Sequence, residues 1–281
     1  MAQHTPRCYR RGVSIAQPLQ PDQDAQRWGA HVAAYERVFE GLTDAFARRA
    51  LDLLEPLRGA CLLDVAAGAG GAALQAAQRG AQVTAVDASP RMAARIRERA
   101  PEVTARVMDG TALELPDGAF DAALSCFGVV LFPDAARGMA ELHRVLRPGG
   151  RAAIVTWTEP HRYELAARLR DAVLAIRGAM PPGELPAQLR FTDPARLREL
   201  CAGAGFTDVR IERAEAALVA GSASGLAASL AFAPGMAALL DAMGRDRDAV
   251  LQAFVARLQA DQGDGTISLG AVAHIAVATR M

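Results

Sequence analysis

The stretch LLDVAAGAGG, residues 62–71, constrains the fold of this chain more than any other. Its first residues are apolar, as in a short buried strand, and Asp64 brings a carboxylate near the end of that strand. The residues that follow are alanines and glycines, so the backbone carries almost no side chains there. A bare backbone permits close approach of another group. We therefore expect a large ligand to lie against this loop.

Strands and helices alternate after this stretch. Apolar runs predict strands at 61–65, 82–86, 103–107, 120–124 and 151–156, and the segments between them predict helices at 71–79, 90–100 and 133–146. Ser89 followed by Pro90 marks a helix start, and Pro148-Gly149-Gly150 marks a sharp helix end. This alternation predicts a parallel sheet with helices on both faces, in which ligands bind at the carboxyl ends of the strands.

Acidic residues lie at the ends of three consecutive predicted strands: Asp64, Asp87 and Asp109. Each alone is compatible with a solvated loop or a helix cap. The run GAGGAA also matches the dinucleotide fingerprint G-x-G-x-x-A, whose helix start holds a pyrophosphate. Asp64 would repel a pyrophosphate but attract an ammonium or a sulfonium. Asp87 can accept both hydroxyls of a ribose, and Asp109 can accept from the exocyclic amine of adenine. Ribose recognition by Asp87 fits a dinucleotide as well, whereas Asp64 and Asp109 favour S-adenosylmethionine.

Four segments then carry a resemblance to a known family: LLDVAAGAGG, VTAVDASPRM, DGTALELPDGAFDAALSCFGVVLFPD and ELHRVLRPGGRAAIVTW. In this order and spacing, residues 60–157 resemble a class I S-adenosylmethionine-dependent methyltransferase. They are most similar to the group of ubiquinone- and menaquinone-biosynthesis and other small-molecule methyltransferases. The later segment FTDPARLRELCAGAGFTDVRIE is similar to the helix and strand that follow the core in this family. These motifs are specific for the family and poorly specific for substrate.

The resemblance implies a Rossmann-like, doubly wound α/β fold with a seven-stranded sheet, mostly parallel with the last strand antiparallel, plus a helical cap. S-adenosylmethionine is the implied cofactor. An aromatic residue of an N-terminal helix often covers it in related enzymes. Tyr35 is the candidate here, and a place in a core stripe with Phe39 and Leu42 is the alternative. The implied cofactor-binding residues are Tyr35, Asp64, Ala66, Gly68, Gly70, Asp87, Ala88, Met92, Asp109, Gly110, Thr111, Ser125 and Cys126.

The chain also departs from the family pattern. Ala66 stands at the first glycine of the loop, and because alanine lacks glycine's freedom at positive φ, we expect an ordinary backbone conformation there. Residues 130–132 include no histidine at a place where many relatives carry one. His161, just beyond the fifth strand, is the candidate catalytic base, with a solvated histidine at a helix start as the alternative. His31, near the N-terminal lid, is a further histidine that could face the site.

Composition narrows the class of protein. The formal net charge is +0, from 31 basic and 31 acidic residues without a long run of one sign, which argues against a nucleic-acid or membrane partner. The 4 cysteines are far apart, so we expect no metal site and no disulfide framework. The arginines among residues 7–11 are not followed by an apolar segment, which argues against a secretory signal. We expect a cytoplasmic protein that is a monomer or a homodimer.

We expect three parts: an N-terminal arm and lid helices at 1–55, an S-adenosylmethionine-binding core at 56–158, and helical cap insertions with the remaining core strands at 159–281. Residues 216–244 are strongly apolar and are expected to fold over the cleft as a lid facing the transferable methyl group. Ordinary helix packing and a dimer contact are the alternatives. Such a lid favours a small apolar or aromatic acceptor, methylated on O, N or C. Cyclisation or rearrangement with the same cofactor, and a non-catalytic binding module, are the rival functions.

Overall fold

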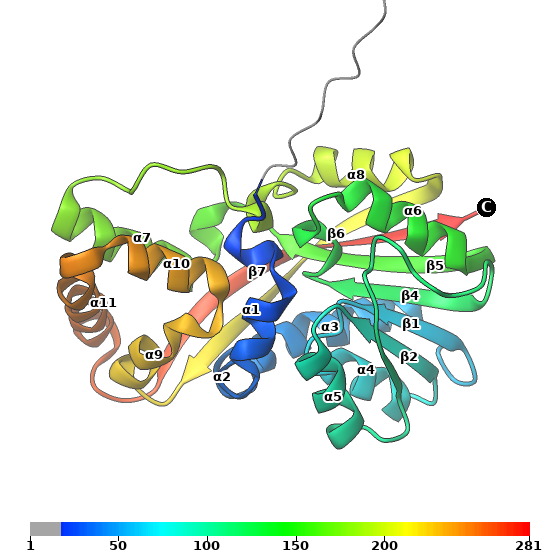
Figure 1. The fold of residues 1–281 in the computed structure, drawn as a ribbon, viewed down its shortest axis with the longest axis horizontal. Coiled ribbons are helices and arrows are strands. Elements are labelled where there is room, and N and C mark those ends of the chain that lie inside the picture. The colour runs from blue at the N-terminus through cyan, green and yellow to red at the C-terminus, as the bar shows by residue number, and fades with distance from the viewer. Residues whose placement is uncertain (1–17) are drawn as a thin grey trace, which may run out of the picture.

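The computed structural model describes residues 18–281, so most of the arm expected at the N-terminus lies outside the described residues. Seven strands form one sheet in the order β3-β2-β1-β4-β5-β7-β6 (Figure 1). Each neighbouring pair is parallel except the two pairs made by β7, which is antiparallel to β5 and to β6. The predicted fold class is therefore confirmed. The strands are β1 (Cys61–Val65), β2 (Gln82–Asp87), β3 (Thr104–Val107), β4 (Phe120–Cys126), β5 (Leu146–Trp157), β6 (Phe206–Ala220) and β7 (Ile267–Arg280).

Helices cover both faces of the sheet (Figure 1). One face carries α3 (Glu40–Leu54), α4 (Gly71–Gln78) and α5 (Pro90–Arg99), and the other carries α6 (Ala135–Val145) and α8 (Pro194–Gly203). Successive side chains of β1 divide between the two cores. Leu62 packs in the core that includes α3, whereas Leu63 packs in the core that includes α6. Burial on both faces explains why this strand is apolar almost throughout.

The strand order positions a crevice. The chain continues from β1 to β2 and β3 on one side of the sheet, and from β4 to β5 on the other side. Because β1 and β4 are neighbours, the loops that follow their carboxyl ends diverge, and ligands bind at such a point in open α/β sheets. The loop after Val65 therefore lies opposite the segment after Cys126.

Two strands extend well beyond the rest of the sheet. β5 ends at Trp157, opposite Ala273, whereas β6 and β7 stay paired as far as Ala220 and Ile267. On this extension lies a second lobe made of α7 (Glu164–Arg177), α9 (Ala223–Ser229), α10 (Pro234–Ala242) and α11 (Arg247–Gln262) (Figure 1). Short 3-10 turns connect the elements: η1 (Pro21–Gln23), η2 (Val129–Leu131), η3 (Pro160–Arg162), η4 (Ala187–Leu189), η5 (Leu230–Phe232) and η6 (Gly244–Asp246).

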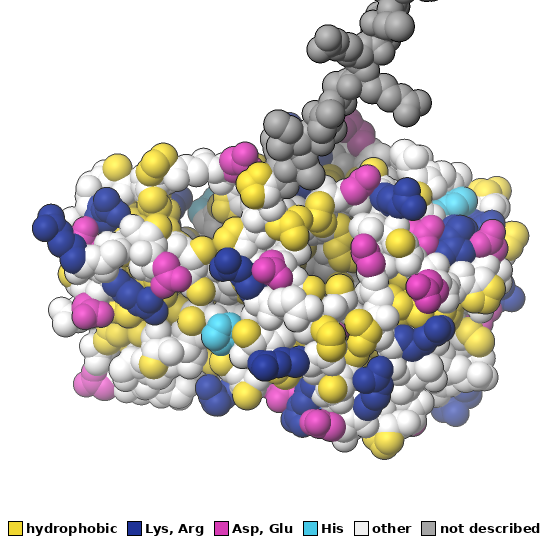
Figure 2. Space-filling model, viewed as in Figure 1, with side chains coloured by type: hydrophobic (Ala, Val, Ile, Leu, Met, Phe, Trp, Pro, Cys, Tyr) yellow, Lys and Arg dark blue, Asp and Glu magenta, His cyan; other side chains and the backbone are white. Residues whose placement is uncertain are grey.

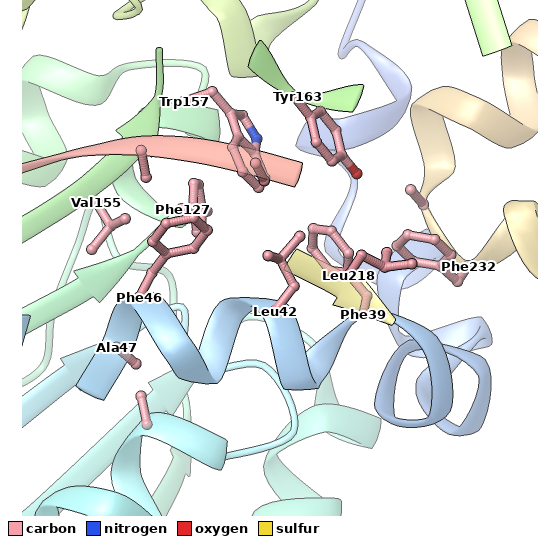
Figure 3. Close-up of a cluster of buried hydrophobic side chains, with 14 of the residues drawn as sticks. Phe39, Leu42, Phe46, Ala47, Phe127, Val155, Trp157, Tyr163, Leu218 and Phe232 are labelled. Carbon is pink, nitrogen blue, oxygen red and sulfur yellow. The ribbon is translucent and has the colours of Figure 1, made fainter. Parts of the chain in front are cut away.

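An aromatic cluster joins the sheet to the N-terminal helices and to the second lobe (Figure 3). The ring of Trp157, at the end of β5, stacks on Phe127 with 4.0 Å between ring centroids and on Tyr163 with 4.3 Å. The ring of Phe39 lies 4.9 Å from that of Phe232. Aromatic pairs of this kind contribute about 0.5–1.5 kcal/mol beyond the area that they bury. They hold together segments that are far apart in the sequence.

The apolar stripe of residues 28–54 predicts a helical segment that Gly41 divides into two helices, and the structure divides it elsewhere. The structure has α1 (Ala25–Ala30) and α2 (Val32–Val38) ahead of α3, with breaks at His31 and Phe39, and Gly41 lies inside α3. The ring of Phe39 is buried in the aromatic cluster. Because this tertiary contact fixes where the chain bends, local helix periodicity placed the break wrongly.

Among residues 18–281, no single helix has both the length and the apolar character needed to cross a membrane. Two consecutive helical segments, Ala223–Phe232 and Pro234–Ala242, are long and apolar enough only when taken together, and they are bent by 102° relative to each other. Leu226, Leu230 and Leu240 of this pair are buried.

Candidate functional site

A cavity of about 370 Å³, here called the main cavity, opens at the carboxyl ends of β1 and β4. Many of the residues implied by the sequence line it: Tyr35, Ala66, Gly68, Asp87, Ala88, Met92, Asp109, Gly110, Thr111 and Cys126. The N-terminal segment and the turn after β4 complete it with Leu19, Asp22, Gln23, Ala25, Trp28, Phe39, Thr43, Phe127, Gly128, Leu131, Phe132, Pro133 and Asp134, together with Met108 from the end of β3. No arginine, lysine or histidine is among its described lining residues. The main cavity is thus acidic and apolar.

The loop after β1 turns sharply, and its conformation corrects the expectation for Ala66. Ala66 has φ 58°, and Gly68 has φ 57°, so both lie in the left-handed region. This conformation costs about 1–2 kcal/mol for alanine. The neighbouring strand end is very close, since a Cβ added to Gly128 would lie 2.4 Å from the Cβ of Ala66. The Ala67 amide also donates to the Val86 carbonyl at 3.1 Å. The loop therefore packs closely against the neighbouring strand end, and the Ala66 backbone is strained as a result. Strained backbone of this kind is typical of functional loops.

Asp87 links this loop to the next helix. Its Oδ2 accepts from the Gly68 amide at 2.9 Å, and its Oδ1 accepts from the Ser89 amide at 2.8 Å. Burial raises the pKa of Asp87 to about 6, although both amides favour the charged form. A carboxylate has about four acceptor positions, so Asp87 keeps acceptor capacity for a ligand in the main cavity.

Asp109 and its neighbours form another wall. Asp109 Oδ1 accepts from the amide of Thr111 and from its hydroxyl, both at 2.8 Å, which fixes the carboxylate. Gly110 has no side chain at a place where the Phe132 ring lies, since an added Cβ would meet the ring at 2.4 Å. The close contact of Phe132 with Gly110 brings an aromatic side chain into the same cavity wall as a fixed carboxylate.

A second, small cavity of about 30 Å³ adjoins the main one and is lined by three carboxylates, those of Glu40, Asp44 and Asp64. Asp64 is 1% exposed, and within residues 18–281 its Oδ2 has no hydrogen-bond partner. Burial, and then the charges of Asp87 and Asp44, raise the pKa of Asp64 to about 7. Arg99 pairs with Glu40 at 2.6 Å. The unpaired acceptors of this small cavity suit a cation that donates hydrogen bonds.

Tyr35 lies between the two cavities and lines both. Its hydroxyl is 3.2 Å from the Thr43 hydroxyl, and it lies 3.7 Å from the place where a Cβ on Gly68 would be. Its ring also packs against Phe39, with 5.7 Å between centroids, and against Trp28, with 6.2 Å. The sequence allowed two interpretations of Tyr35, a residue that covers the cofactor and a member of a core stripe. The structure places Tyr35 in the cavity wall and in contact with Phe39, so the two interpretations are compatible.

Three residues proposed from the sequence lie outside both cavities. Ser125 is buried and ties two strand ends together, since its hydroxyl donates to the Val65 carbonyl at 2.9 Å. Gly70 precedes α4, where an added Cβ would meet Ile96 at 2.9 Å. His161 is exposed on η3 and lines neither cavity, so this geometry lends no support to the prediction that it is the catalytic base. His31, also exposed, is placed no better.

The segment 216–244 also differs from the expected lid. None of its residues lines the main cavity or the small one. Instead it packs behind the N-terminal segment, where Phe232 contacts Phe39 and the Gly235 amide donates to Asp22 Oδ1 at 2.6 Å. The residues that cover the cavity are those of η1, α1 and α2.

Sequence reasoning missed several lining residues, of which Asp22, Trp28 and Phe132 are the most prominent. Asp22 falls in a polar stretch that resembled a loose arm, and no local pattern distinguishes it from Asp24. Phe132 carried one signal, because it is a large apolar side chain directly before Pro133-Asp134 at the end of a predicted strand. Their places in the site depend on contacts that the sequence does not reveal.

A family model described as a methyltransferase domain matches residues 63–154. The chain is 36% identical over 181 residues to a demethylmenaquinone methyltransferase of Thermus thermophilus, which covers 59% of this chain and 82% of that protein. The YcgJ protein of Bacillus subtilis has a similar fold, with a TM-score of 0.55 at 18% identity over 84% of this chain and 98% of that one.

A second solved structure agrees in fold. It is a phosphoethanolamine N-methyltransferase of Haemonchus contortus in complex with phosphomonomethylethanolamine and S-adenosylhomocysteine. Its TM-score is 0.55 at 19% identity, over 92% of this chain and 60% of that one. Together with the sequence relatives and the acidic strand ends, these findings establish the family. The chain belongs to the class I S-adenosylmethionine-dependent methyltransferases of the menaquinone and small-molecule group, and S-adenosylmethionine is its methyl donor.

Proposed function

We propose that S-adenosylmethionine lies along the main cavity, with its methionine end at Asp64, its ribose at Asp87 and its adenine beside Asp109, and that the acceptor is a small apolar or aromatic metabolite. One observation carries this proposal. Three strand-end carboxylates surround a single pair of adjoining cavities whose other walls are largely apolar. The main cavity has a volume of about 370 Å³, which lies within the usual range for small-molecule sites, roughly 300–1,000 Å³.

The small cavity fits the amino group of the cofactor. Asp64 Oδ2 has no partner within the described chain, and Asp44, whose pKa burial raises to about 6, lines the same space. An ammonium group in this position supplies the missing hydrogen bonds to the carboxylates and offsets their charge. A phosphate would meet repulsion there. This argues against a nicotinamide dinucleotide as the ligand.

The opposite end fits a nucleoside. Asp87 is held by two backbone amides and keeps acceptor positions for the two ribose hydroxyls. Met92, Phe132 and Gly110 line the main cavity together with Asp109 and make its wall apolar there. A planar base stacks favourably on such a surface, and the fixed carboxylate of Asp109 offers an acceptor to an exocyclic amine.

The remaining walls suit the methyl acceptor. Trp28, Phe39, Phe127 and Leu131 supply further apolar side chains to the lining of the main cavity. An apolar or aromatic acceptor gains favourable burial there, at about 25 cal/mol per Å² of apolar surface removed from water. The relative from Thermus thermophilus is a demethylmenaquinone methyltransferase, which supports an acceptor of this chemical type.

Methyl transfer requires mainly that the acceptor is correctly positioned. S-adenosylmethionine supplies a methyl group on a sulfonium, which is a good leaving group. The chain's own contribution is to hold the acceptor in line with that methyl group and to exclude water, through the aromatic wall of Tyr35, Phe39 and Phe127. A methyltransferase built in this way depends on the fit of its N-terminal segment over the cavity.

The proposal extends to the whole chain. We assign residues 1–55 to an arm and lid, 56–158 to the cofactor-binding core and 159–281 to cap insertions and remaining core strands. Acidic and basic side chains are interspersed over the face in Figure 2, and the formal net charge is +0, which supports a small-molecule partner and not a nucleic acid. A cytoplasmic enzyme of small-molecule biosynthesis, monomeric or homodimeric, fits these features.

Calorimetry with S-adenosylhomocysteine and with NAD tests the ligand assignment. We expect micromolar binding of S-adenosylhomocysteine, which is about −8 kcal/mol, and weaker binding of NAD. The variant Asp87→Ala should lose about 2–4 kcal/mol of this affinity because two charge-assisted hydrogen bonds disappear. Asp248→Ala, an exposed position in α11, is the matched control. Tighter binding of NAD than of S-adenosylhomocysteine would contradict the assignment.

A further inference from the structure

Asp22 is a buried carboxylate in the wall of the main cavity. It lies in η1, is 7% exposed, and none of the sequence motifs includes it. Its Oδ1 accepts from the Gly235 amide at 2.6 Å, and its backbone carbonyl accepts from the Trp28 indole at 2.9 Å. Nearby, the Gln20 side chain accepts from the Ala187 amide at 2.8 Å. The carboxylate itself is therefore held by α10, and the short turn that carries it is held by α1 and by the η4 segment.

The surroundings of Asp22 are those of a proton acceptor, not of an ion-pair partner. The described lining of the main cavity contains no basic side chain, and no salt bridge of residues 18–281 includes Asp22. Burial raises the pKa of Asp22, and the Gly235 amide opposes this only in part. The titratable group that faces it is Tyr163, a buried phenol whose pKa burial and the Asp22 charge raise. The carboxylates of Asp87 and Asp109 line the nucleoside end.

Histidine is the side chain most often used to remove a proton in catalysis, but no histidine of residues 18–281 lines the main cavity. Among the described carboxylates that line the main cavity, Asp87 and Asp109 are assigned to the nucleoside and Asp134 caps α6, which leaves Asp22, whose backbone carbonyl bonds the Trp28 indole. The plain alternative is that Asp22 only fastens η1 to α10. A fastening needs one oxygen on the Gly235 amide, and Oδ2 accepts no hydrogen bond from the described residues. The second oxygen remains for a ligand.

We propose that Asp22 binds a proton-donating group of the methyl acceptor, a hydroxyl or an N–H on an otherwise apolar or aromatic molecule, and takes up its proton during methyl transfer. This inference rests on the proposed function of the main cavity. In the step, the bond from the acceptor's O or N to the methyl carbon forms, and the sulfur–methyl bond breaks with its electron pair staying on sulfur. The proton of the acceptor passes to the Asp22 carboxylate and from there to solvent.

Binding to the protein saturated with S-adenosylhomocysteine tests recognition. The probes are 2-naphthol and 2-methoxynaphthalene, which share a ring system but differ in the proton that Asp22 accepts. The wild-type protein should prefer the naphthol by about 10-fold or more, which corresponds to ~1.4 kcal/mol. Asp22→Asn keeps an oxygen for the Gly235 amide and should lose most of the preference. Asp24→Asn, a cap of α1 outside the cavity, should keep it. An equal preference in all three proteins, or no binding of either probe, would overturn the proposal.

Turnover with S-adenosylmethionine tests proton transfer. Naphthols, hydroxyquinolines and aromatic amines serve as acceptors, and kcat is measured at saturating cofactor and acceptor so that cofactor affinity does not enter. Asp22→Asn should lower kcat roughly 100- to 10,000-fold and remove the acidic limb of the pH profile, and Asp22→Glu should restore part of both. A profile unchanged in Asp22→Asn, or no methylation of any acceptor of this class, would overturn the proposal.

The two proposals fail in different ways. Titration of S-adenosylhomocysteine into each variant reports the cofactor site, and Asp22→Asn and Asp24→Asn should both bind it within a factor of about two of wild type. Loss of this binding in wild type would refute the assignment of the cavity itself. Normal cofactor binding with no effect of Asp22→Asn on acceptor preference or kcat would refute only the role of Asp22.

Discussion

At the scale of single residues, the cofactor site contains groups that are unfavourable in the free protein. Asp64 is almost fully buried with an unpaired oxygen, and Ala66 is held at φ 58°. An unpaired buried polar atom and a strained backbone each cost on the order of 1–3 kcal/mol. The packed strands on both sides impose them. A protein keeps such unfavourable groups where a ligand needs them. The binding of a cation at Asp64 supplies a partner for its unpaired oxygen and so removes that cost.

The variant Asp64→Asn should therefore separate stability from binding. The pKa of Asp64 is raised to about 7 in the folded chain, so its contribution to stability is present below about pH 4 and is lost as the pH rises through 7. We expect Asp64→Asn to raise the free energy of unfolding of the ligand-free protein by roughly 2–4 kcal/mol at pH 8 and by little at pH 4. Urea denaturation at both pH values measures this.

The same variant should bind S-adenosylhomocysteine at least about 10-fold more weakly, since its amide attracts an ammonium less than a carboxylate does. Asp248→Asn, exposed in α11, is the control for both measurements. A gain in stability that is equal at pH 4 and pH 8 would contradict the account, and so would unaltered ligand affinity.

Cofactor affinity should also depend on pH. In the free protein, burial raises the pKa of Asp87 and of Asp44 to about 6 and that of Asp64 to about 7. The ligand needs the charged forms, so its affinity should be highest above pH 7 and fall as protons compete between pH 7 and pH 5. Calorimetry in buffers of different ionisation enthalpy should show proton release near pH 6. Constant affinity from pH 5 to pH 8 would rule out these carboxylates as ligands.

At the scale of elements, the turn η2 after β4 is fixed from outside by one arginine. The Arg190 guanidinium donates to the carbonyl of Val130 at 2.8 Å and to that of Phe132 at 2.6 Å. Burial lowers the pKa of Arg190, and no carboxylate of residues 18–281 pairs with it. Because Phe132 lies against Gly110, this contact positions the cavity wall at the proposed nucleoside end.

Removing the guanidinium should loosen that wall. We expect Arg190→Gln to lower the free energy of unfolding by about 1–3 kcal/mol, because the hydrogen bonds that the charged guanidinium donates to the carbonyls of Val130, Phe132 and Ala187 are lost. The variant should also bind S-adenosylhomocysteine several-fold more weakly. Thermal unfolding and calorimetry measure the two effects. Arg196→Gln, an exposed position on α8, should change neither. Wild-type affinity in Arg190→Gln would show that η2 holds its place without this contact.

At the scale of the whole molecule, the second lobe and the N-terminal segment form one cover. The Asp22–Gly235 hydrogen bond and the Phe39–Phe232 contact connect η1 and the start of α3 to the second lobe, and the two phenylalanine rings are seen in Figure 3. Residues of η1, α1 and α2 line the main cavity. The N-terminal helices are short, with 6 residues in α1 and 7 in α2. Helices of this length are marginal alone, so packing maintains them.

Ligand binding should therefore protect this cover. We expect S-adenosylhomocysteine to slow backbone hydrogen exchange in residues 21–38 more than in α6, which packs on the sheet away from the cavity. Residues 234–242 should be slowed less than 21–38, since they support the cover from behind. Mass-spectrometric exchange with and without ligand measures this. Equal protection in 21–38 and α6 would mean that the cover is a rigid part of the fold.

The sequence by itself determined the sheet and the acidic site. Strand ends in a parallel sheet are local features, because the strand, the residue that follows it and the helix start are contiguous in the chain. Asp87 and Asp109 can therefore be predicted from short motifs. The order of the strand–helix units along the chain places both carboxylates at the same edge of the sheet, at the carboxyl ends of the strands. The same locality explains why Ala66 was misjudged, since its φ depends on Gly128 from another strand end.

Only the tertiary structure decided what covers the site. Asp22 reaches its place through a hydrogen bond to Gly235, which is 213 residues away in the chain, and Phe39 bends the N-terminal helices because its ring packs against Phe232. Neither contact leaves a periodic signal in the sequence. The physical reason is that local patterns report which surfaces must be buried, whereas the choice of partner depends on how distant elements pack. That choice left His161 outside both cavities and brought Asp22 into the wall of the main one.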